Sequence, residues 1–197
     1  MRIVLATSNQ GKIKEFKELM PQDEVYAFEE LVGKMSIEET GSTFAQNAVI
    51  KAKAVYEKLN DFGAFVISDD SGISVPLFKN EPGIYSARYA SVNATDKQNN
   101  SKLLNKLKET NLSFTPAFYT ACIAIVFKGE VYTVHGWMHG KIIDEERGSN
   151  GFGYDPMFIP NGHDKTLGEL ESHIKKAFSH RSQALVLAKK ILDVLAK

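Results

Sequence analysis

Short β-rich runs alternate with segments of helical periodicity along this chain. The run Arg2–Thr7 ends in a polar turn, and Lys12–Met20 then carries apolar residues at helical spacing. A longer helix is predicted to begin after Thr43, because apolar residues recur every three or four positions as far as Leu59, and Thr43 with Gln46 predicts a capping box. Because strands and helices mix in this way, we expect an α/β fold.

A hairpin is predicted in the second half of the chain, where Phe118–Phe127 and Val131–Met138 are β-rich and a short turn separates them. An antiparallel hairpin among alternating elements favours a mixed sheet over a purely parallel one. We therefore expect a twisted mixed sheet flanked by helices, with two lobes around a central substrate cleft. The other predicted elements are strands over Ala64–Ser68 and Ile73–Phe78, helices after Thr95 and over Ser182–Leu195, and a loop over 148–160.

Length and charge narrow the class of protein. A chain of 197 residues, 43% apolar, is large enough for one core without staples, so 1–197 is predicted to be a single domain. Lys+Arg 24 balances Asp+Glu 24, which disfavours a nucleic-acid or membrane partner and favours a small molecule. The lone Cys122, a polar N-terminus and the lack of a long apolar run lead us to expect a reducing, cytoplasmic setting.

The first polar cluster, Thr7-Ser8-Asn9-Gln10-Gly11-Lys12, lies between a predicted strand and a predicted helix. A helix N-terminus with a lysine can bind phosphate through free backbone N–H groups, although the spacing is not that of a Walker A loop. An ordinary Asn-capped helix is the alternative. Lys12 counts against that alternative, because a cation in the first helical turn opposes the helix dipole.

The second cluster, Asp69-Asp70-Ser71-Gly72, follows an apolar strand. Adjacent carboxylates suit Mg²⁺, and one of them could orient or deprotonate a water. The same residues also make a good turn, which composition alone favours. Glu38 and Glu39 could add a metal ligand, or could be merely solvated.

Two further clusters lie near the C-terminus. The loop 148–156 sets Phe152 and Tyr154 among glycines beside Asp155, which suits stacking on a base and reading its edge, or simply a loop held by a buried Phe. Lys175, His180 and Arg181 gather near the start of the last predicted helix, where the dipole disfavours cations. An anionic or carbonyl-rich ligand would explain them, and a solvated helix start is the alternative.

Six short motifs occur in order along nearly the whole chain, and with them the sequence resembles the inosine triphosphate pyrophosphatase family. The motifs are Thr-Ser-Asn-x-Gly-Lys-x-x-Glu at 7–15, Glu-Glu-Thr-Gly at 38–41, Ser-Asp-Asp-Ser-Gly at 68–72, Pro-Gly-Ile-Tyr-Ser-Ala-Arg-Tyr-Ala at 82–90, Gly-Phe-Gly-Tyr-Asp-Pro at 151–156 and Ser-His-Arg-Ser-Gln-Ala-Leu at 179–185. The resemblance implies that a homodimer hydrolyses ITP, dITP and XTP to the monophosphate and pyrophosphate with Mg²⁺.

The resemblance also implies roles for individual residues. Glu39 and Asp70 resemble metal-associated carboxylates, with Asp70 as proton acceptor for the attacking water, and Ser71 resembles a substrate contact. The triphosphate-binding turn would be Thr7, Ser8, Asn9, Gln10, Gly11 and Lys12, and the base pocket would be Phe152, Gly153, Tyr154, Asp155, Lys175, His180 and Arg181. Gln46, where the family usually has Glu, and Gly168, where it has Ala, depart from the family pattern.

Two other functions remain open from the sequence. A nucleotide-sensing module without catalysis could use the same glycines, lysine and aromatic residues, but it would have less need of Asp69, Asp70 and Glu39 together. A phosphatase that removes the terminal phosphate would release orthophosphate and the diphosphate. The products formed from ITP separate these alternatives.

Overall fold

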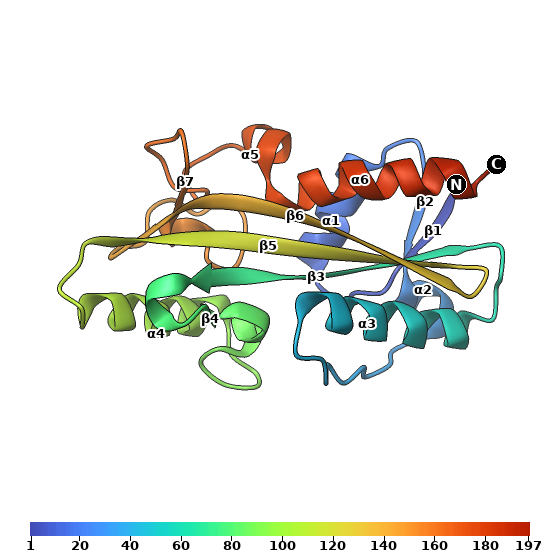
Figure 1. The fold of residues 1–197 in the computed structure, drawn as a ribbon, viewed down its shortest axis with the longest axis horizontal. Coiled ribbons are helices and arrows are strands. Elements are labelled where there is room, and N and C mark those ends of the chain that lie inside the picture. The colour runs from blue at the N-terminus through green and yellow to red at the C-terminus, as the bar shows by residue number, and fades with distance from the viewer. The chain divides into compact units, whose positions relative to one another are not determined.

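A seven-stranded mixed sheet is the centre of the computed structural model, which describes residues 1–197 (Figure 1). The strand order is β2-β1-β3-β5-β6-β7, and β4 pairs with β3 off this path. Strand β1 is parallel to β2 and β3, whereas β4 and β7 run antiparallel to β3 and β6, so the predicted mixed α/β sheet is confirmed. The strands are β1 (Arg2–Leu5), β2 (Glu24–Ala27), β3 (Phe65–Val75), β4 (Glu81–Pro82), β5 (Phe114–Phe127), β6 (Glu130–Ile143) and β7 (Phe158–Pro160).

The two helices that the sequence predicts after Thr43 and Thr95 begin directly after these residues, whereas the last helix begins at His180, two residues before the predicted start. Thr95 forms a full capping box with Gln98, whereas Thr43 accepts only the backbone N–H of Gln46, whose side chain turns to the Ser42 N–H instead. The predicted capping box at Thr43 is therefore half formed. The helices are α1 (Gln10–Leu19), α2 (Phe28–Val32), α3 (Phe44–Leu59), α4 (Asp96–Lys108), α5 (Ser172–Phe178) and α6 (His180–Leu195).

The contacts divide the chain into two compact units. Unit 1 consists of Met1–Asp70, Ala121–Gly136 and Arg181–Lys197, and unit 2 consists of Ser71–Thr120 and Trp137–His180. Three strands, β3, β5 and β6, contribute residues to both. Each unit has a hydrophobic core of its own.

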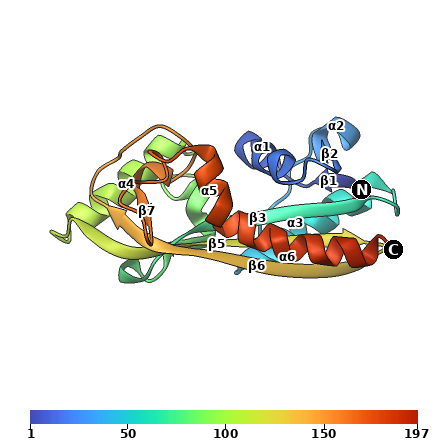
Figure 2. The ribbon, with the colours of Figure 1, turned by 90° about the horizontal axis from the view of Figure 1, so that it is seen from above.

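In unit 1, apolar layers that include helices cover both faces of the sheet. Successive side chains of a strand point to opposite faces, and in β3 Ile67 joins one apolar layer while Val66 joins the other. The Ile67 layer includes residues of α1 and α6, and the Val66 layer includes residues of α3 (Figure 1). Figure 2 shows α6 lying along β5 and β6. The same alternation continues into the polar residues at the end of this part of β3.

Unit 2 has a core built on the second half of β3. Ile73 and Val75 pack there with Leu103 and Leu107 of α4 and with Phe158 of β7. The loop 148–156, which the sequence predicts as irregular, packs into this core through the buried Tyr154.

The predicted acidic turn at Asp69–Gly72 is wrong, because β3 runs without interruption through it. The residue types of this segment favour a turn, but tertiary contacts override that local preference. Cations pair with both carboxylates, and Gly72 allows close packing. A Cβ on Gly72 would lie 2.3 Å from Ser86 Oγ. The predicted hairpin is correct, although β5 and β6 extend beyond the predicted ends, and β2, β4, β7, α2 and α5 are additional.

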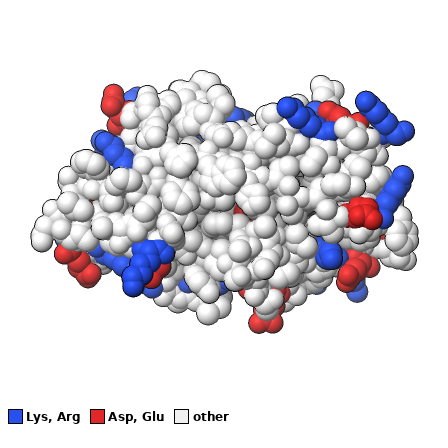
Figure 3. Space-filling view, viewed as in Figure 1, with Lys and Arg blue, Asp and Glu red and all other residues white.

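The surface is mixed in charge on the face that Figure 3 shows, where lysines and arginines alternate with acidic residues around a largely uncharged centre. None of the helices has the length and apolar character that crossing a membrane requires.

Cys122 should be chemically inert in the folded protein. It is fully buried in β5, and burial, helped by the nearby carboxylates of Asp69 and Asp70, raises the pKa of its thiol to about 12. Because the thiolate is the reactive form, we expect no measurable labelling by a thiol reagent at pH 8 and rapid labelling in denaturant. Rapid labelling of the native protein would contradict this burial.

Candidate functional site

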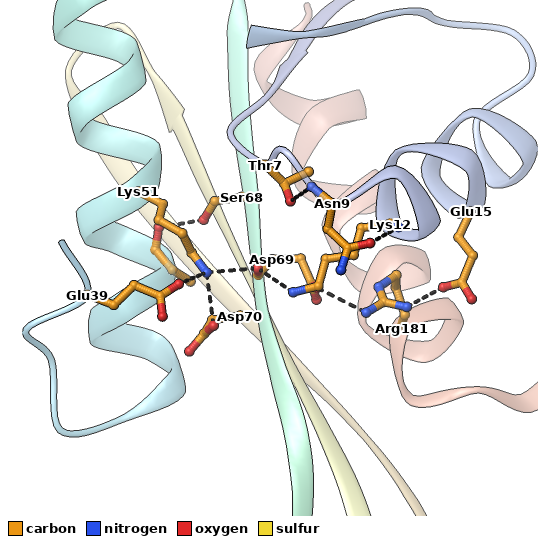
Figure 4. Close-up of polar contacts among 11 residues, drawn as sticks. Thr7, Asn9, Lys12, Glu15, Glu39, Lys51, Ser68, Asp69, Asp70 and Arg181 are labelled. Atoms are coloured by element: carbon orange, nitrogen blue, oxygen red, sulfur yellow. Dashed lines mark hydrogen bonds and ion pairs between the residues drawn. The ribbon is translucent and has the colours of Figure 1, made fainter. Parts of the chain in front are cut away.

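Two consecutive carboxylates of β3 belong to two different polar clusters. Asp69 faces α1 and the start of α6, and Asp70 faces α3, because neighbouring side chains of a strand alternate in direction (Figure 4). Asp69 is 1% exposed and Asp70 is 6% exposed. The middle of β3 therefore presents carboxylates in two directions within unit 1.

Asp69 forms a buried ion cluster with Lys12 and Arg181. Its Oδ2 lies 2.8 Å from Lys12 Nζ and 3.1 Å from Arg181 Nη2, and Arg181 Nη1 also pairs with Glu15. Burial alone would raise the pKa of Asp69, but Arg181 and Lys12 outweigh it and hold that pKa well below its usual value. Asp69 is thus ionised at neutral pH and holds the buried Arg181 and the largely buried Lys12.

Asp70 shares a lysine with Glu39 on the other side of β3. Lys51 Nζ lies 2.9 Å from Asp70 Oδ1 and 2.8 Å from Glu39 Oε1 (Figure 4). Asp70 Oδ2 is buried and has no hydrogen-bond partner. Burial raises the pKa of Asp70, and Lys51 opposes this only in part. This carboxylate is less completely neutralised than Asp69.

The loop that carries Glu39 is fixed to the start of α3. Asn47 is fully buried, and its Oδ1 accepts the N–H of Gly41 at 2.8 Å. A Cβ on Gly41 would lie 2.6 Å from that oxygen, so this close approach requires glycine. The loop thereby brings Glu39 to Lys51.

Lys51 is a site residue that the sequence analysis does not identify. It is one turn beyond Asn47 and three residues beyond the buried Ala48, so it lies on the buried side of α3. A lysine on such a face is rarely buried without a carboxylate partner. Its position on the apolar stripe is the signal that predicts such a partner.

The turn before α1 is an Asn-capped helix start. Asn9 Oδ1 accepts the N–H of Lys12, Thr7 Oγ1 accepts the N–H of Asn9, and Ser8 Oγ donates to Glu29. The first-turn N–H groups, those of Gln10 and Gly11, have no carbonyl partner within a helix. The turn therefore has the anion-binding geometry of a helix N-terminus, beside the Lys12 ammonium.

Unit 2 contains a second polar group around Asp155. Its Oδ2 accepts from Lys175 Nζ at 2.7 Å and from the N–H of Phe152 at 3.0 Å, and Lys175 Nζ lies 4.9 Å from the centre of the Phe152 ring. Asp155 is 3% exposed and Lys175 is 7% exposed. The predicted association of these three residues is present in the structure.

The other predicted base-pocket residues differ in their surroundings. Tyr154 is buried and donates its hydroxyl to the Ser86 carbonyl, so its ring is part of the core of unit 2. His180 stacks on Tyr119 with the ring centres 4.7 Å apart. Arg181, although next in sequence, has its ion pairs with carboxylates in unit 1.

Glu39 and Asp70 fit a divalent cation. Both carboxylates already converge on one cationic nitrogen, and Asp70 Oδ2 is buried without a partner, which is costly unless a cation or water satisfies it. The structure has no cluster of three His, Cys, Asp or Glu residues that could enclose a metal ion. A cation held by one or two carboxylates and completed by water and phosphate oxygens is the arrangement typical of Mg²⁺.

Known proteins resemble this chain over its full length. The model of the Ham1 family matches residues 3–191. A dITP/XTP pyrophosphatase of Aliarcobacter butzleri is 62% identical, and the alignment covers 99% of this chain and 100% of that protein. A dITP/XTP pyrophosphatase of Sulfurovum sp. is 57% identical, and the alignment covers 99% of this chain and 95% of that protein.

Solved structures agree with these relatives. The Ham1 protein of Staphylococcus aureus superposes with a TM-score of 0.85 at 42% identity, and that of Coxiella burnetii with a TM-score of 0.86 at 36% identity. Each alignment covers 98% of both chains. The resemblance inferred from the six motifs is confirmed, and the chain belongs to the Ham1 family.

Proposed function

We propose that this protein hydrolyses noncanonical purine nucleoside triphosphates, namely ITP, dITP and XTP, to the monophosphate and pyrophosphate. Its relatives named dITP/XTP pyrophosphatase support the substrate class. The observation that carries the proposal is the pair of carboxylates on β3, each next to a lysine, with Glu39 opposite Asp70. The homodimer that the family resemblance implies belongs to the same proposal.

Glu39 and Asp70 would hold Mg²⁺, and Asp70 would also orient the attacking water. When bound, the ion neutralises phosphate charge and polarises the phosphoryl oxygens. Lys51 is placed to neutralise further charge, because its ammonium contacts both carboxylates. Cleavage of a phosphoanhydride requires chiefly positioning and charge neutralisation, which these residues supply.

The turn Thr7–Lys12 would bind the triphosphate, and Ser71, the residue after Asp70, would contact the substrate. The capped helix start offers N–H donors, and Lys12 offers a cation fixed in place by Asp69. Arg181 would act through Asp69, because its guanidinium is paired with that carboxylate and with Glu15. Besides the place in the base pocket that the family resemblance implies, Arg181 would therefore have a positioning role toward Lys12.

Lys12→Ala should weaken the handling of every nucleoside triphosphate to a similar extent. A charge-assisted hydrogen bond contributes about 1.5–3 kcal/mol, so kcat/KM for ITP and for ATP should each fall about 10- to 100-fold. Lys14→Ala, which removes an exposed lysine from the same helix, is the matched control. A change in the ITP-to-ATP ratio without a general loss would show that Lys12 reads the base.

Phe152, Asp155, Lys175 and His180 would recognise the base. Inosine and xanthosine present an acceptor oxygen at the purine 6-position, whereas adenine presents an amino donor. Lys175 has only donors to offer, and Asp155 fixes its ammonium above the Phe152 ring. A site that donates to the 6-oxo group would leave the adenine amino group facing donors.

The experiment that tests this function compares kcat/KM for ITP, XTP, GTP and ATP in the presence of Mg²⁺. We expect ITP and XTP to exceed ATP, by about 10⁴-fold if the polar edge is fully satisfied. Lys175→Met, which retains the apolar stem, should reduce the ITP-to-ATP ratio. Equal hydrolysis of ATP and ITP by the wild type would overturn the proposed base recognition.

A further inference from the structure

Helix α4 holds both polar backbone groups of a single residue in the loop that carries Phe152. Asp96 Oδ2 accepts the N–H of Gly153 at 2.7 Å, and Asn100 Nδ2 donates to the Gly153 carbonyl at 3.1 Å. Asp96 and Asn100 are four residues apart and so lie on the same face of the helix. One helical turn therefore fixes the position and the orientation of one peptide segment.

Asn100 is poorly explained by stability alone. It is 3% exposed, and its Oδ1 is buried without a hydrogen-bond partner. A buried side-chain amide whose NH₂ group has a hydrogen-bond partner but whose oxygen has none costs free energy that an apolar side chain would avoid. The residue that it holds, Gly153, has a φ of +63°, and because glycine populates positive and negative φ about equally, its own backbone does not select this conformation. The donor therefore maintains a particular loop conformation.

That conformation determines where Phe152 lies. Phe152 directly precedes Gly153, its N–H is bound by Asp155, and its ring lies beside Lys175. Rotation of the Phe152–Gly153 peptide group, whose N–H Asp96 binds, would move the Phe152 backbone and disturb its hydrogen bond to Asp155. The aromatic ring and the buried ion pair are thus oriented from α4 as one group.

We propose that Asp96 and Asn100 are positioning residues for base selection, which they control through the backbone N–H and carbonyl of Gly153 without contacting the substrate. This inference rests on the proposed function, in which Phe152, Asp155 and Lys175 read the base. The two side chains bind the two peptide groups that flank Gly153, so their effects on selectivity are coupled. They leave the chemistry at Asp70 unchanged.

The decisive variants are Asn100→Asp, which is nearly isosteric but turns an acceptor toward the Gly153 carbonyl, and Asp96→Ala, which removes the acceptor. We expect KM for ITP to rise about tenfold and the ITP-to-ATP ratio of kcat/KM to fall about tenfold, with kcat for ITP within about twofold of the wild type. Asp96→Asn retains an acceptor oxygen, so its ITP-to-ATP ratio of kcat/KM should be closer to that of the wild type than to that of Asp96→Ala. The double variant should lose less than the product of the two single losses.

Thr95→Ala is the matched control, because it removes the cap of the same helix without contacting Gly153. It should lower the melting temperature and leave the ITP-to-ATP ratio unchanged. Hydrogen exchange of the Gly153 amide gives a readout without turnover: exchange should be faster in Asp96→Ala and Asn100→Asp than in Thr95→Ala.

The inference is overturned if Asn100→Asp and Asp96→Ala fold and keep the wild-type ratio, or if Thr95→Ala shifts that ratio equally. It is also overturned if Asp96→Asn behaves as Asp96→Ala does. A wild-type protein that shows no preference for ITP would instead refute the proposed function. The two failures are therefore distinguishable.

Discussion

Asp70→Asn should lower kcat for ITP about 10³-fold while the protein stays folded, because a general base or water-orienting carboxylate contributes about 10²- to 10⁴-fold. The substitution is nearly isosteric and removes the charge on which both metal and water would depend. It also leaves Lys51 paired with Glu39, so no buried cation loses its last partner. Steady-state kinetics at saturating ITP and Mg²⁺ measures the effect.

The stability of the same variant separates a catalytic role from a structural one. Burial raises the pKa of Asp70, so the folded state disfavours its ionised form and folding at neutral pH carries a cost. Asp70→Asn should therefore be at least as stable as the wild type. Asp193→Asn, at an exposed ion pair of α6, is the control for the substitution type and should leave turnover unchanged. Near wild-type turnover in Asp70→Asn would refute the proposed role of this carboxylate.

Asp69→Asn should have the opposite effect and destabilise the fold by about 3–5 kcal/mol, the usual cost of removing one partner of a buried ion pair. Asp69 is buried between Lys12 and Arg181, and its loss leaves both cations with less compensation. Urea unfolding at pH 7 measures the difference. Asp193→Asn, with a side chain 57% exposed, should cost at most about 1 kcal/mol.

The pH dependence of this difference follows from the sign of the pKa shift. The folded-state pKa of Asp69 is depressed, so its stabilising contribution is fully present above the unfolded pKa of about 3.9 and is lost as the pH falls toward the lower folded value. The stability gap between the wild type and Asp69→Asn should therefore narrow below about pH 4. A gap under about 1 kcal/mol at pH 7 would contradict the anchoring role of Asp69.

Local signals in the sequence are sufficient for much of the fold. Thr43 and Thr95 mark helix starts because an N-cap is satisfied within one turn of chain. The Asp69–Gly72 segment of β3 could not be predicted in the same way, because its residue types favour a turn, whereas its strand conformation depends on contacts with residues distant in sequence. Short elements such as α2 and α5 are missed because they carry too few residues for a periodicity to be recognised.

The sequence identifies many of the residues of the candidate site, but it does not show which of them contact one another. Asp69 and Asp70 are adjacent in sequence, but strand alternation sends them to different partners, one of which, Lys51, the motifs do not reveal. The side chains of His180 and Arg181 also have different partners, because successive residues of a helix point about 100° apart. His180 stacks on Tyr119, whereas Arg181 pairs with Asp69.

The identity of the products formed from ITP and Mg²⁺ tests the central claim most directly. A nucleoside triphosphate pyrophosphatase releases IMP and pyrophosphate in equal amounts, and this is the result that we predict for the wild type. Asp70→Asn, assayed in parallel, should form neither product at a comparable rate. Release of IDP and orthophosphate would indicate a phosphatase, binding of ITP without turnover would indicate a nucleotide-sensing module, and either result would contradict the proposed function.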